Sequence, residues 1–209
     1  MKEYLTVSCE SVSEQTIEKS RFITTIAPAD TAEKAKSVIE RVSKQNPFAT
    51  HNCYAYIVRE NGVVKMKFGD DGEPQGTAGL PMLESLKQND LENVVAVVTR
   101  YFGGIKLGAG GLIRAYSSSV SAGIKNADVV RAVLCDIIFV ETDYDFYNTV
   151  LRVFSECGAT VKNSEFGDRV RVSARVEKNK AETLKNKIIE NSKGKIIPET
   201  TGEEYCFIK

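Results

Sequence analysis

The feature that most constrains this sequence is a continuous apolar run that leads into a glycine-rich segment. The run, Val94–Val98, contains four valines and one alanine, and such a run predicts a strand that is covered on both faces. Five glycines then fall within nine residues, Gly103–Gly111. They permit positive φ angles or the close approach of a partner. A helix is expected from there to about Asn126, and we expect the functional surface to lie around this loop.

Strand and helix patterns alternate along the rest of residues 1–130. Asn61-Gly62 between two strand-like runs indicates a hairpin, and Asp30 or Thr31 is a suitable N-cap for a helix that runs through Gln45. Pro81 suits the first turn of a helix that ends near Lys87. The predicted strands are Tyr4–Cys9, Phe22–Ala27, His51–Val58, Val63–Phe68 and Leu91–Thr99. These elements predict an α+β domain over residues 1–130.

Residues 131–209 have the order β-α-β-β-α-β, which is that of a ferredoxin-like domain. The predicted strands are Arg131–Thr142, Thr160–Phe166, Arg169–Val176 and Lys195–Thr200. The predicted helices are Asp145–Cys157 and Lys180–Asn191. The sequence contains no internal repeat, low-complexity tract or long linker. The predicted fold class is therefore α+β, with two domains.

Bulk properties exclude several classes of protein. No apolar run approaches the roughly 18–20 residues of a membrane-spanning helix, and the amino terminus lacks an apolar signal core. We therefore expect a cytoplasmic protein. The 28 basic residues balance the 28 acidic ones, so there is no global basic excess and no DNA-specific signal.

The five cysteines include no C-x-x-C pair, which argues against a zinc site or a disulfide framework. Cys9, Cys53 and Cys135 lie in strand-like apolar surroundings, where cysteine behaves as a small buried hydrophobe. We therefore expect these three thiols to be buried.

The acidic segment Asp70–Gly79 is the first candidate site. Asp70, Asp71 and Glu73 place three carboxylates within four residues, which need solvent, a cation or basic partners. Their spacing is not that of an EF-hand loop, so we expect no metal and no cofactor. Small residues around Thr77 precede a helix, where free backbone N–H groups can hold an anion. A solvated surface turn has the same composition and remains an alternative.

The glycine-rich segment is the second candidate. A buried strand, a glycine loop and a helix form the arrangement that cradles phosphates, but the Walker motif fails at Gly108-Ala109 and the dinucleotide motif fails at Ile113. A tight turn with close helix packing is the structural alternative. The candidate binding residues of this segment are Arg100, Tyr101, Gly103, Gly104, Lys106, Gly108, Gly110 and Arg114.

Two further patterns involve histidine and arginine. His51 and Cys53 are two residues apart on a strand, roughly 6–7 Å, too far for a nucleophile–base pair, so His51 is retained only as a binding candidate and no catalytic residue is named. In the second domain, Arg169, Arg171 and Arg175 alternate with aliphatic residues and fall on one face of a strand. Such a face is suited to phosphate backbones, although ordinary solubilising surface has the same pattern.

The segments Ser20–Phe22, Ala49–Ala55, Asp70–Gly79 and Arg100–Tyr116 resemble the signature segments of the IMPACT family, in particular its bacterial YigZ branch. The resemblance covers roughly residues 18–128. It implies a first domain that is similar to domain IV of elongation factor G and a second that is similar to the ferredoxin-like domain of that factor.

Eukaryotic members of this family inhibit activation of a general-control kinase by competing for its activator. Bacteria lack that pathway, so for this chain the resemblance implies only a role in translation. The first hypothesis is a non-enzymatic regulatory protein that binds RNA, the ribosome or a translation factor, with Arg169, Arg171 and Arg175 contacting nucleic acid. The alternative is an enzyme of unknown substrate whose acidic and glycine-rich loops form a pocket.

Overall fold

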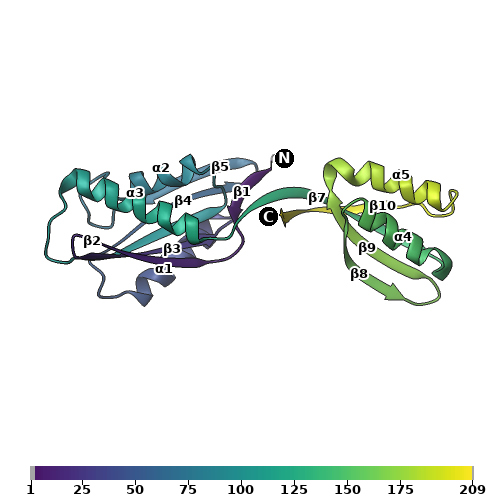
Figure 1. The fold of residues 1–209 in the computed structure, drawn as a ribbon, viewed down its shortest axis with the longest axis horizontal. Helices are drawn as coiled ribbons and strands as arrows, with labels where there is room; N and C mark the ends of the chain where they lie inside the picture. The colour runs from purple at the N-terminus through teal and green to yellow at the C-terminus, as the bar shows by residue number, and fades with distance from the viewer. Residues whose placement is uncertain (1–2, 209) are drawn as a thin grey trace. The chain divides into compact units, whose positions relative to one another are not determined.

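The computed structural model describes residues 3–208 and divides into two compact units (Figure 1). The first comprises residues 4–131, and the second comprises residues 132–208 together with Glu3. Each unit has its own β-sheet and its own hydrophobic core. The predicted α+β class and two-domain organisation are therefore confirmed.

The first unit contains a five-stranded sheet in the order β2-β3-β6-β4-β5, with every neighbouring pair antiparallel. These strands are β2 (Ser11–Ile17), β3 (Ser20–Pro28), β4 (His51–Glu60), β5 (Val63–Gly69) and β6 (Val94–Tyr101). A short strand, β1 (Tyr4–Val7), is bridged in parallel at Leu5 to Leu91. The apolar run predicted to be a buried strand lies in β6, at the centre of the sheet.

Helices cover both faces of this sheet. Helices α2 (Gly79–Gln88) and α3 (Gly108–Asn126) pack on one face, and α1 (Ala32–Gln45) packs on the other (Figure 1). Strand β6 contributes side chains to the cores on both faces of the sheet. Val94, Ala96 and Val98 face α2 and α3. Val95 and Val97 face α1. Because successive side chains of a strand alternate between faces, the uninterrupted apolar run is required here.

Local signals in the sequence account for the ends of these elements. Thr31 is the N-cap of α1, and its hydroxyl accepts the backbone N–H of Lys34 (3.1 Å). Asn61 and Gly62 connect β4 to β5 with φ angles of 50° and 80°, the pair of positive values that a two-residue type I′ hairpin requires. Both predictions are confirmed.

In the second unit β7, β9 and β8 lie side by side in that order, and β10 also pairs with β7. Its elements are β7 (Val129–Thr142), α4 (Tyr144–Glu156), β8 (Thr160–Phe166), β9 (Val170–Glu177), the 3₁₀ turn Lys178–Lys180, α5 (Ala181–Asn191) and β10 (Glu199–Ile208). Both helices pack against the same face of the sheet, where Val153, Leu184 and Val172 belong to one core. The β-α-β-β-α-β order of a ferredoxin-like domain is confirmed.

Three local expectations were wrong or incomplete. The last strand covers Glu199–Ile208 rather than 195–200, because the chain turns at Gly194 (φ 78°) and buries Ile196 in the core before it reaches the sheet. Strand β2 was not predicted, since it is a polar strand at the edge of the sheet without fully buried positions. Cys9 is exposed, because it lies in a bend between β1 and β2 rather than in a strand.

Candidate functional site

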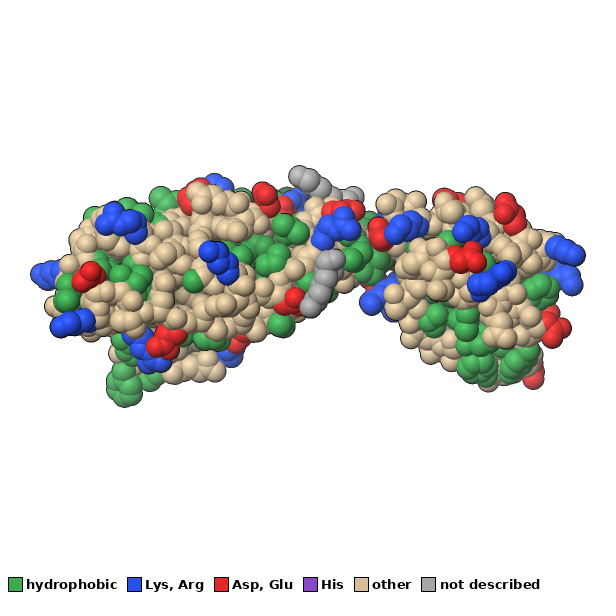
Figure 2. Space-filling model, in the orientation of Figure 1, with side chains coloured by type: hydrophobic (Ala, Val, Ile, Leu, Met, Phe, Trp, Pro, Cys, Tyr) green, Lys and Arg blue, Asp and Glu red, His purple; other side chains and the backbone are tan. Residues whose placement is uncertain are grey.

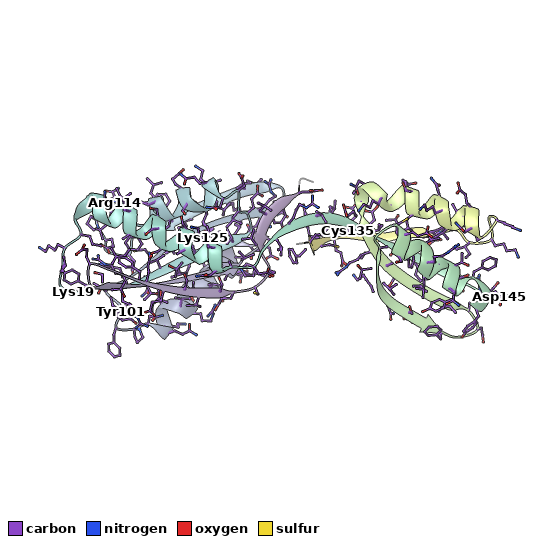
Figure 3. All side chains as sticks on the ribbon, viewed as in Figure 1. Lys19, Tyr101, Arg114, Lys125, Cys135 and Asp145 are labelled. Atoms are coloured by element: carbon purple, nitrogen blue, oxygen red, sulfur yellow. The ribbon has the colours of Figure 1, made fainter. Side chains whose placement is uncertain are left out.

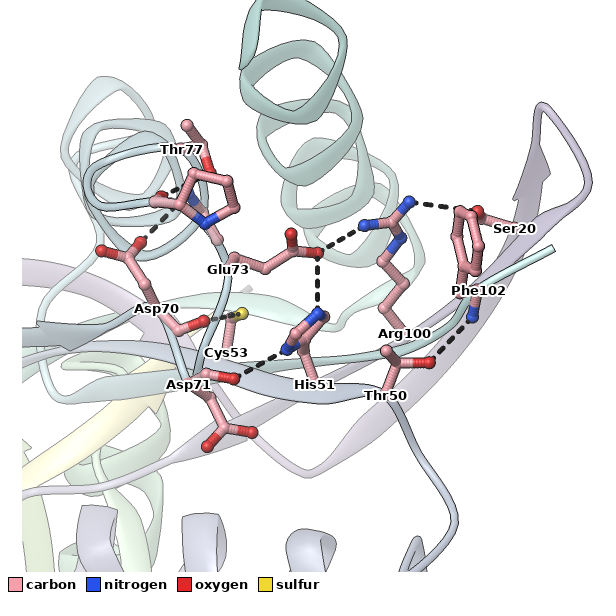
Figure 4. A network of polar contacts seen from close by, with 12 residues as sticks. Ser20, Thr50, His51, Cys53, Asp70, Asp71, Glu73, Thr77, Arg100 and Phe102 are labelled. Atoms are coloured by element: carbon pink, nitrogen blue, oxygen red, sulfur yellow. Dashed lines mark hydrogen bonds and ion pairs between the residues drawn. The ribbon is translucent and has the colours of Figure 1, made fainter. Parts of the chain in front are cut away.

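The acidic loop and the end of β6 meet at a buried ion pair. Nη1 of Arg100 donates to Oε1 of Glu73 at 2.6 Å, and their side chains are only 6% and 3% exposed. Figure 4 shows the pair at the centre of a polar network. The two signature loops are therefore neighbours in space.

Further hydrogen bonds and aromatic rings surround the two charges. The Tyr116 hydroxyl donates to the same Glu73 oxygen (2.8 Å), and Nη2 of Arg100 donates to the Ser20 hydroxyl (3.2 Å). The Arg100 guanidinium lies 5.4 Å from the ring centre of Phe22 and 5.5 Å from that of Phe102. Buried ion pairs persist where such bonds offset the cost of desolvation. The arrangement fixes the loop ends in position.

His51 and Cys53 join this network from β4. His51 lies opposite Arg100 in the sheet. Its Nδ1 is 2.8 Å from the Asp71 carbonyl oxygen, so Nδ1 is the protonated nitrogen, and Nε2 faces Glu73 at 3.8 Å. The Cys53 thiol donates to the Asp70 carbonyl oxygen (2.9 Å), and burial raises its pKa to about 12. Since the thiolate is the nucleophilic form of cysteine, this residue is a poor nucleophile.

Asp70 occupies the backbone N–H groups that we expected to hold an external anion. Its carboxylate accepts hydrogen bonds from the N–H groups of Gly76 (2.8 Å), Ala78 (3.1 Å) and Gly79 (2.8 Å) at the start of α2. Ala78, the N-cap, has no side chain that could do so. The chain's own aspartate therefore fills this position, and the expectation of an open anion site there was wrong.

The rest of the acidic loop is also ordered by internal bonds. The Thr77 hydroxyl donates to the Pro74 carbonyl (2.7 Å). Asp71 is exposed, although its carboxylate accepts the N–H of Asn52 (2.6 Å). The segment therefore connects β5 to α2 through turns in which Asp71 and Pro74 are exposed while Glu73 and Thr77 are buried.

The glycines of the second loop have different roles. An added Cβ on Gly103 would lie 1.9 Å from the Lys19 carbonyl oxygen, so this glycine permits the close approach of two backbones. Gly104 and Gly108 have positive φ angles of 88° and 69°. Gly110 lies in the exposed first turn of α3, and its added Cβ would come no closer than 3.7 Å to an Arg114 side-chain atom. Packing within the chain therefore does not require Gly110.

An exposed surface surrounds this loop, and we call it the glycine-loop rim: Lys19, Phe48, Phe102 and Lys106. Phe48 is 90% exposed and Phe102 is 46% exposed. The two loops that carry them are joined, because the Phe102 N–H donates to the Thr50 hydroxyl (3.0 Å). Neither lysine forms an ion pair within residues 3–208. Figure 2 shows basic and hydrophobic side chains together at this end of the unit, and Figure 3 labels Lys19 and Arg114 there.

The predicted site residues thus separate into two groups. Those that are buried or half-buried, and that hold the loops, are His51, Asp70, Glu73, Thr77, Arg100, Tyr101 and Gly103. The Tyr101 hydroxyl donates to Asn46 (2.9 Å). Those exposed to solvent are Asp71, Gly104, Lys106, Gly108, Gly110 and Arg114.

The candidate site residues named from the sequence did not include Tyr116, Ser20 or the two rim phenylalanines, although Ser20, Phe102 and Tyr116 lie within the signature segments. Tyr116 had a signal, because it lies between Leu112 and Val120 in the apolar stripe of α3, where a buried hydroxyl needs a partner.

Arg171 and Arg175 lie on the face of β9 opposite the buried Val170, Val172, Ala174 and Val176, as the alternation predicted. Arg169 lies in the bend before β9, so the prediction that it belongs to this strand was wrong. Each arginine has a carboxylate nearby. Arg169 approaches Asp143 (3.1 Å) and Glu141 (3.6 Å), Arg171 approaches Glu141 (3.7 Å), and Arg175 approaches Glu204 (4.0 Å). These pairs reduce the positive potential of the face.

Residues 3–208 contain no group of three or more His, Cys, Asp and Glu side chains arranged to hold a metal ion. No helix in that range is long and apolar enough to cross a membrane.

The buried ion pair generates the first prediction. Glu73→Gln leaves the Arg100 charge buried without compensation, and Arg100→Met does the same to Glu73, so each should lower the free energy of unfolding by about 3–5 kcal/mol. The double variant should lose clearly less than the sum, as measured by urea denaturation. Glu14→Gln is the control, because the Arg21–Glu14 pair is exposed and its loss should barely move the midpoint. Additive losses in the double variant would contradict a coupled pair.

The glycine loop generates the second prediction. Gly103→Ala should destabilise the protein by about 1–3 kcal/mol or more, because the new methyl group meets backbone atoms that must shift. Gly110→Ala should instead stabilise it by roughly 0.5–1 kcal/mol, since alanine is the better helix former. Urea denaturation of both variants measures the difference. Effects of the same sign and size would show that Gly103 is not packed as described.

Comparison with known proteins identifies both units. The Impact N-terminal domain matches residues 18–124, and a domain of unknown function, DUF1949, matches residues 140–195. A solved structure described as that of a hypothetical protein has 30% sequence identity and a TM-score of 0.63, and the match covers 97% of this chain and 98% of the other.

Relatives share nearly the whole length. The IMPACT family member YvyE of Bacillus subtilis is 42% identical over 192 residues, which cover 92% of this chain and 88% of that protein. The IMPACT family member YigZ of Escherichia coli is 33% identical over 181 residues, which cover 86% and 89% respectively. The signature segments, the two matched domains and these relatives agree, and the chain belongs to the IMPACT family.

Proposed function

We propose that this protein is a non-enzymatic, cytoplasmic RNA-binding protein with a role in translation, and that it contacts RNA through the glycine-loop rim. The observation that carries the proposal is that the glycine-loop rim has two exposed phenylalanines and two lysines that have no carboxylate partner within residues 3–208. Exposed aromatic rings stack on unpaired bases, and unpaired cations attract the phosphate backbone.

The glycines support this assignment. Gly104 and Gly108 have no protein atom within 4 Å of an added Cβ, and Gly110 has only the flexible Arg114 side chain. A phosphate or a sugar can therefore come close to the backbone at all three positions. The buried Glu73–Arg100 pair below the rim holds both loops in place, so little ordering is required when RNA binds.

Three alternatives remain within the same role in translation. The ribosome would present RNA to the same rim, and a translation factor would present protein instead. The arginine face of the second unit, Arg169, Arg171 and Arg175, is the other candidate for contacting RNA. The carboxylates near these arginines favour the rim as the main contact.

The enzyme hypothesis has less support from the geometry. His51, Glu73 and Arg100 do converge, but Glu73 already accepts bonds from Arg100 and Tyr116. Lys106 makes no hydrogen bond or ion pair with this described cluster. Burial raises the pKa of the Cys53 thiol to about 12, which disfavours the thiolate that a cysteine nucleophile requires.

RNA binding can be measured by fluorescence anisotropy with a labelled 12-nucleotide oligouridylate across a range of salt concentrations. Phe48→Ala should weaken binding by roughly 5- to 150-fold, the equivalent of about 1–3 kcal/mol of base stacking. Replacing both Lys19 and Lys106 with Gln should reduce the slope of log K against log salt concentration by about 1.4. Each lysine–phosphate contact to single-stranded RNA contributes about 0.7 to that slope.

Charge reversal of Arg169, Arg171 and Arg175 provides the comparison. If the second unit holds the RNA, that variant flattens the salt dependence and the rim variants bind normally. Such a result, or oligouridylate affinity that no rim substitution changes, would contradict the proposed surface.

A further inference from the structure

A second surface lies on the helical layer of the first unit, where α2 and α3 run past each other. They border an open groove of about 890 Å³. Its apolar lining includes Leu80 and Pro81 from α2 and Ile113 and Ala122 from α3. Leu80 and Ile113 are 41% and 42% exposed, so two large aliphatic side chains face solvent in one groove. Neither the RNA-binding proposal nor the buried network accounts for this groove.

Small serines line the groove between these side chains, and their hydroxyls are already bonded. The Ser117 hydroxyl donates to the Ile113 carbonyl (2.9 Å), and that of Ser121 donates to the Ser117 carbonyl (2.9 Å). The Ser85 hydroxyl of α2 lies 3.1 Å from that of Ser121. Because these groups have partners within the protein, an apolar side chain can cover them without leaving a donor unsatisfied. The small side chains also let a partner approach closely.

The charged side chains that α3 contributes to the groove are both positive. Arg114 and Lys125 both line it (Figure 3), and neither forms an ion pair within residues 3–208. They are eleven residues apart on one helix, about 16 Å along its axis. On the α2 side, Glu84 is already paired with Lys87 (2.9 Å). The charge left for a partner is therefore positive.

We propose that this groove binds an amphipathic, acidic helix of a partner protein. Apolar side chains of about three helical turns would cover Leu80 and Ile113, and carboxylates near the two ends would pair with Arg114 and Lys125. This is the helix-in-groove mode of recognition. The apolar lining favours a peptide over RNA, because the groove offers two cations and no exposed aromatic ring on which a base could stack.

The test uses the full chain and a displayed library of random 16-residue peptides. Selection should enrich amphipathic sequences with acidic residues, and synthetic copies should become helical on binding. Ser117→Tyr fills the groove and should weaken these peptides roughly tenfold or more. Lys125→Glu should weaken the acidic peptides as well. Ser37→Tyr is the matched control, because it places the same side chain on exposed α1, on the other face of the sheet, and it should leave peptide binding unchanged.

Several outcomes would overturn the proposal. Selected peptides without acidic enrichment, or with equal affinity for the Ser117→Tyr variant, would show that the groove is not the docking site. Oligouridylate binding that is lost in Ser117→Tyr but retained in Phe48→Ala would assign the groove to RNA instead. Because Phe48 lies on the rim and does not line the groove, failure of the RNA-binding proposal and failure of this one are distinguishable. Thermal unfolding of each variant checks that the fold is retained.

Discussion

The buried pair between Glu73 and Arg100 is the interaction on which the end of the first unit that carries the glycine-loop rim depends. It joins a loop that precedes α2 to the end of the central strand, and Tyr116 and Ser20 extend it to α3 and β3. A charge removed from water is tolerated only when its partner is held in place. The sheet, both helices and the two signature loops must therefore be assembled together for either charge to be stable.

Because of this dependence, several residues that the sequence suggested as ligand-binding groups serve instead to hold the fold together. Asp70 caps α2, Glu73 neutralises Arg100, and Gly103 lets the loop pass the Lys19 backbone. Together these contacts hold the two signature loops in place. The side chains left for a ligand are simpler ones, the rim phenylalanines and lysines, and these carry the proposed recognition of RNA.

Patterns in the sequence were sufficient for most of the architecture. The run of valines specified a strand with two covered faces, and Thr31 and Asn61-Gly62 marked a helix start and a hairpin because each satisfies a local backbone requirement. Strand β2 was missed because a polar edge strand has little hydrophobic signal. The pairing of Glu73 with Arg100 could not be derived from periodicity either, since it joins residues that are far apart in the sequence.

The central claim, that one buried network holds both loops, is tested most directly by native-state hydrogen exchange of the unmodified protein. The amides of Gly76 and Gly79 bond to Asp70, and those of Phe102 and Gly103 bond to Thr50 and Ser20. If the network is one unit, all four amides should exchange through a single opening, with the same free energy and the same dependence on denaturant. Separate openings, with the acidic loop exchanging independently of the glycine loop, would contradict the account.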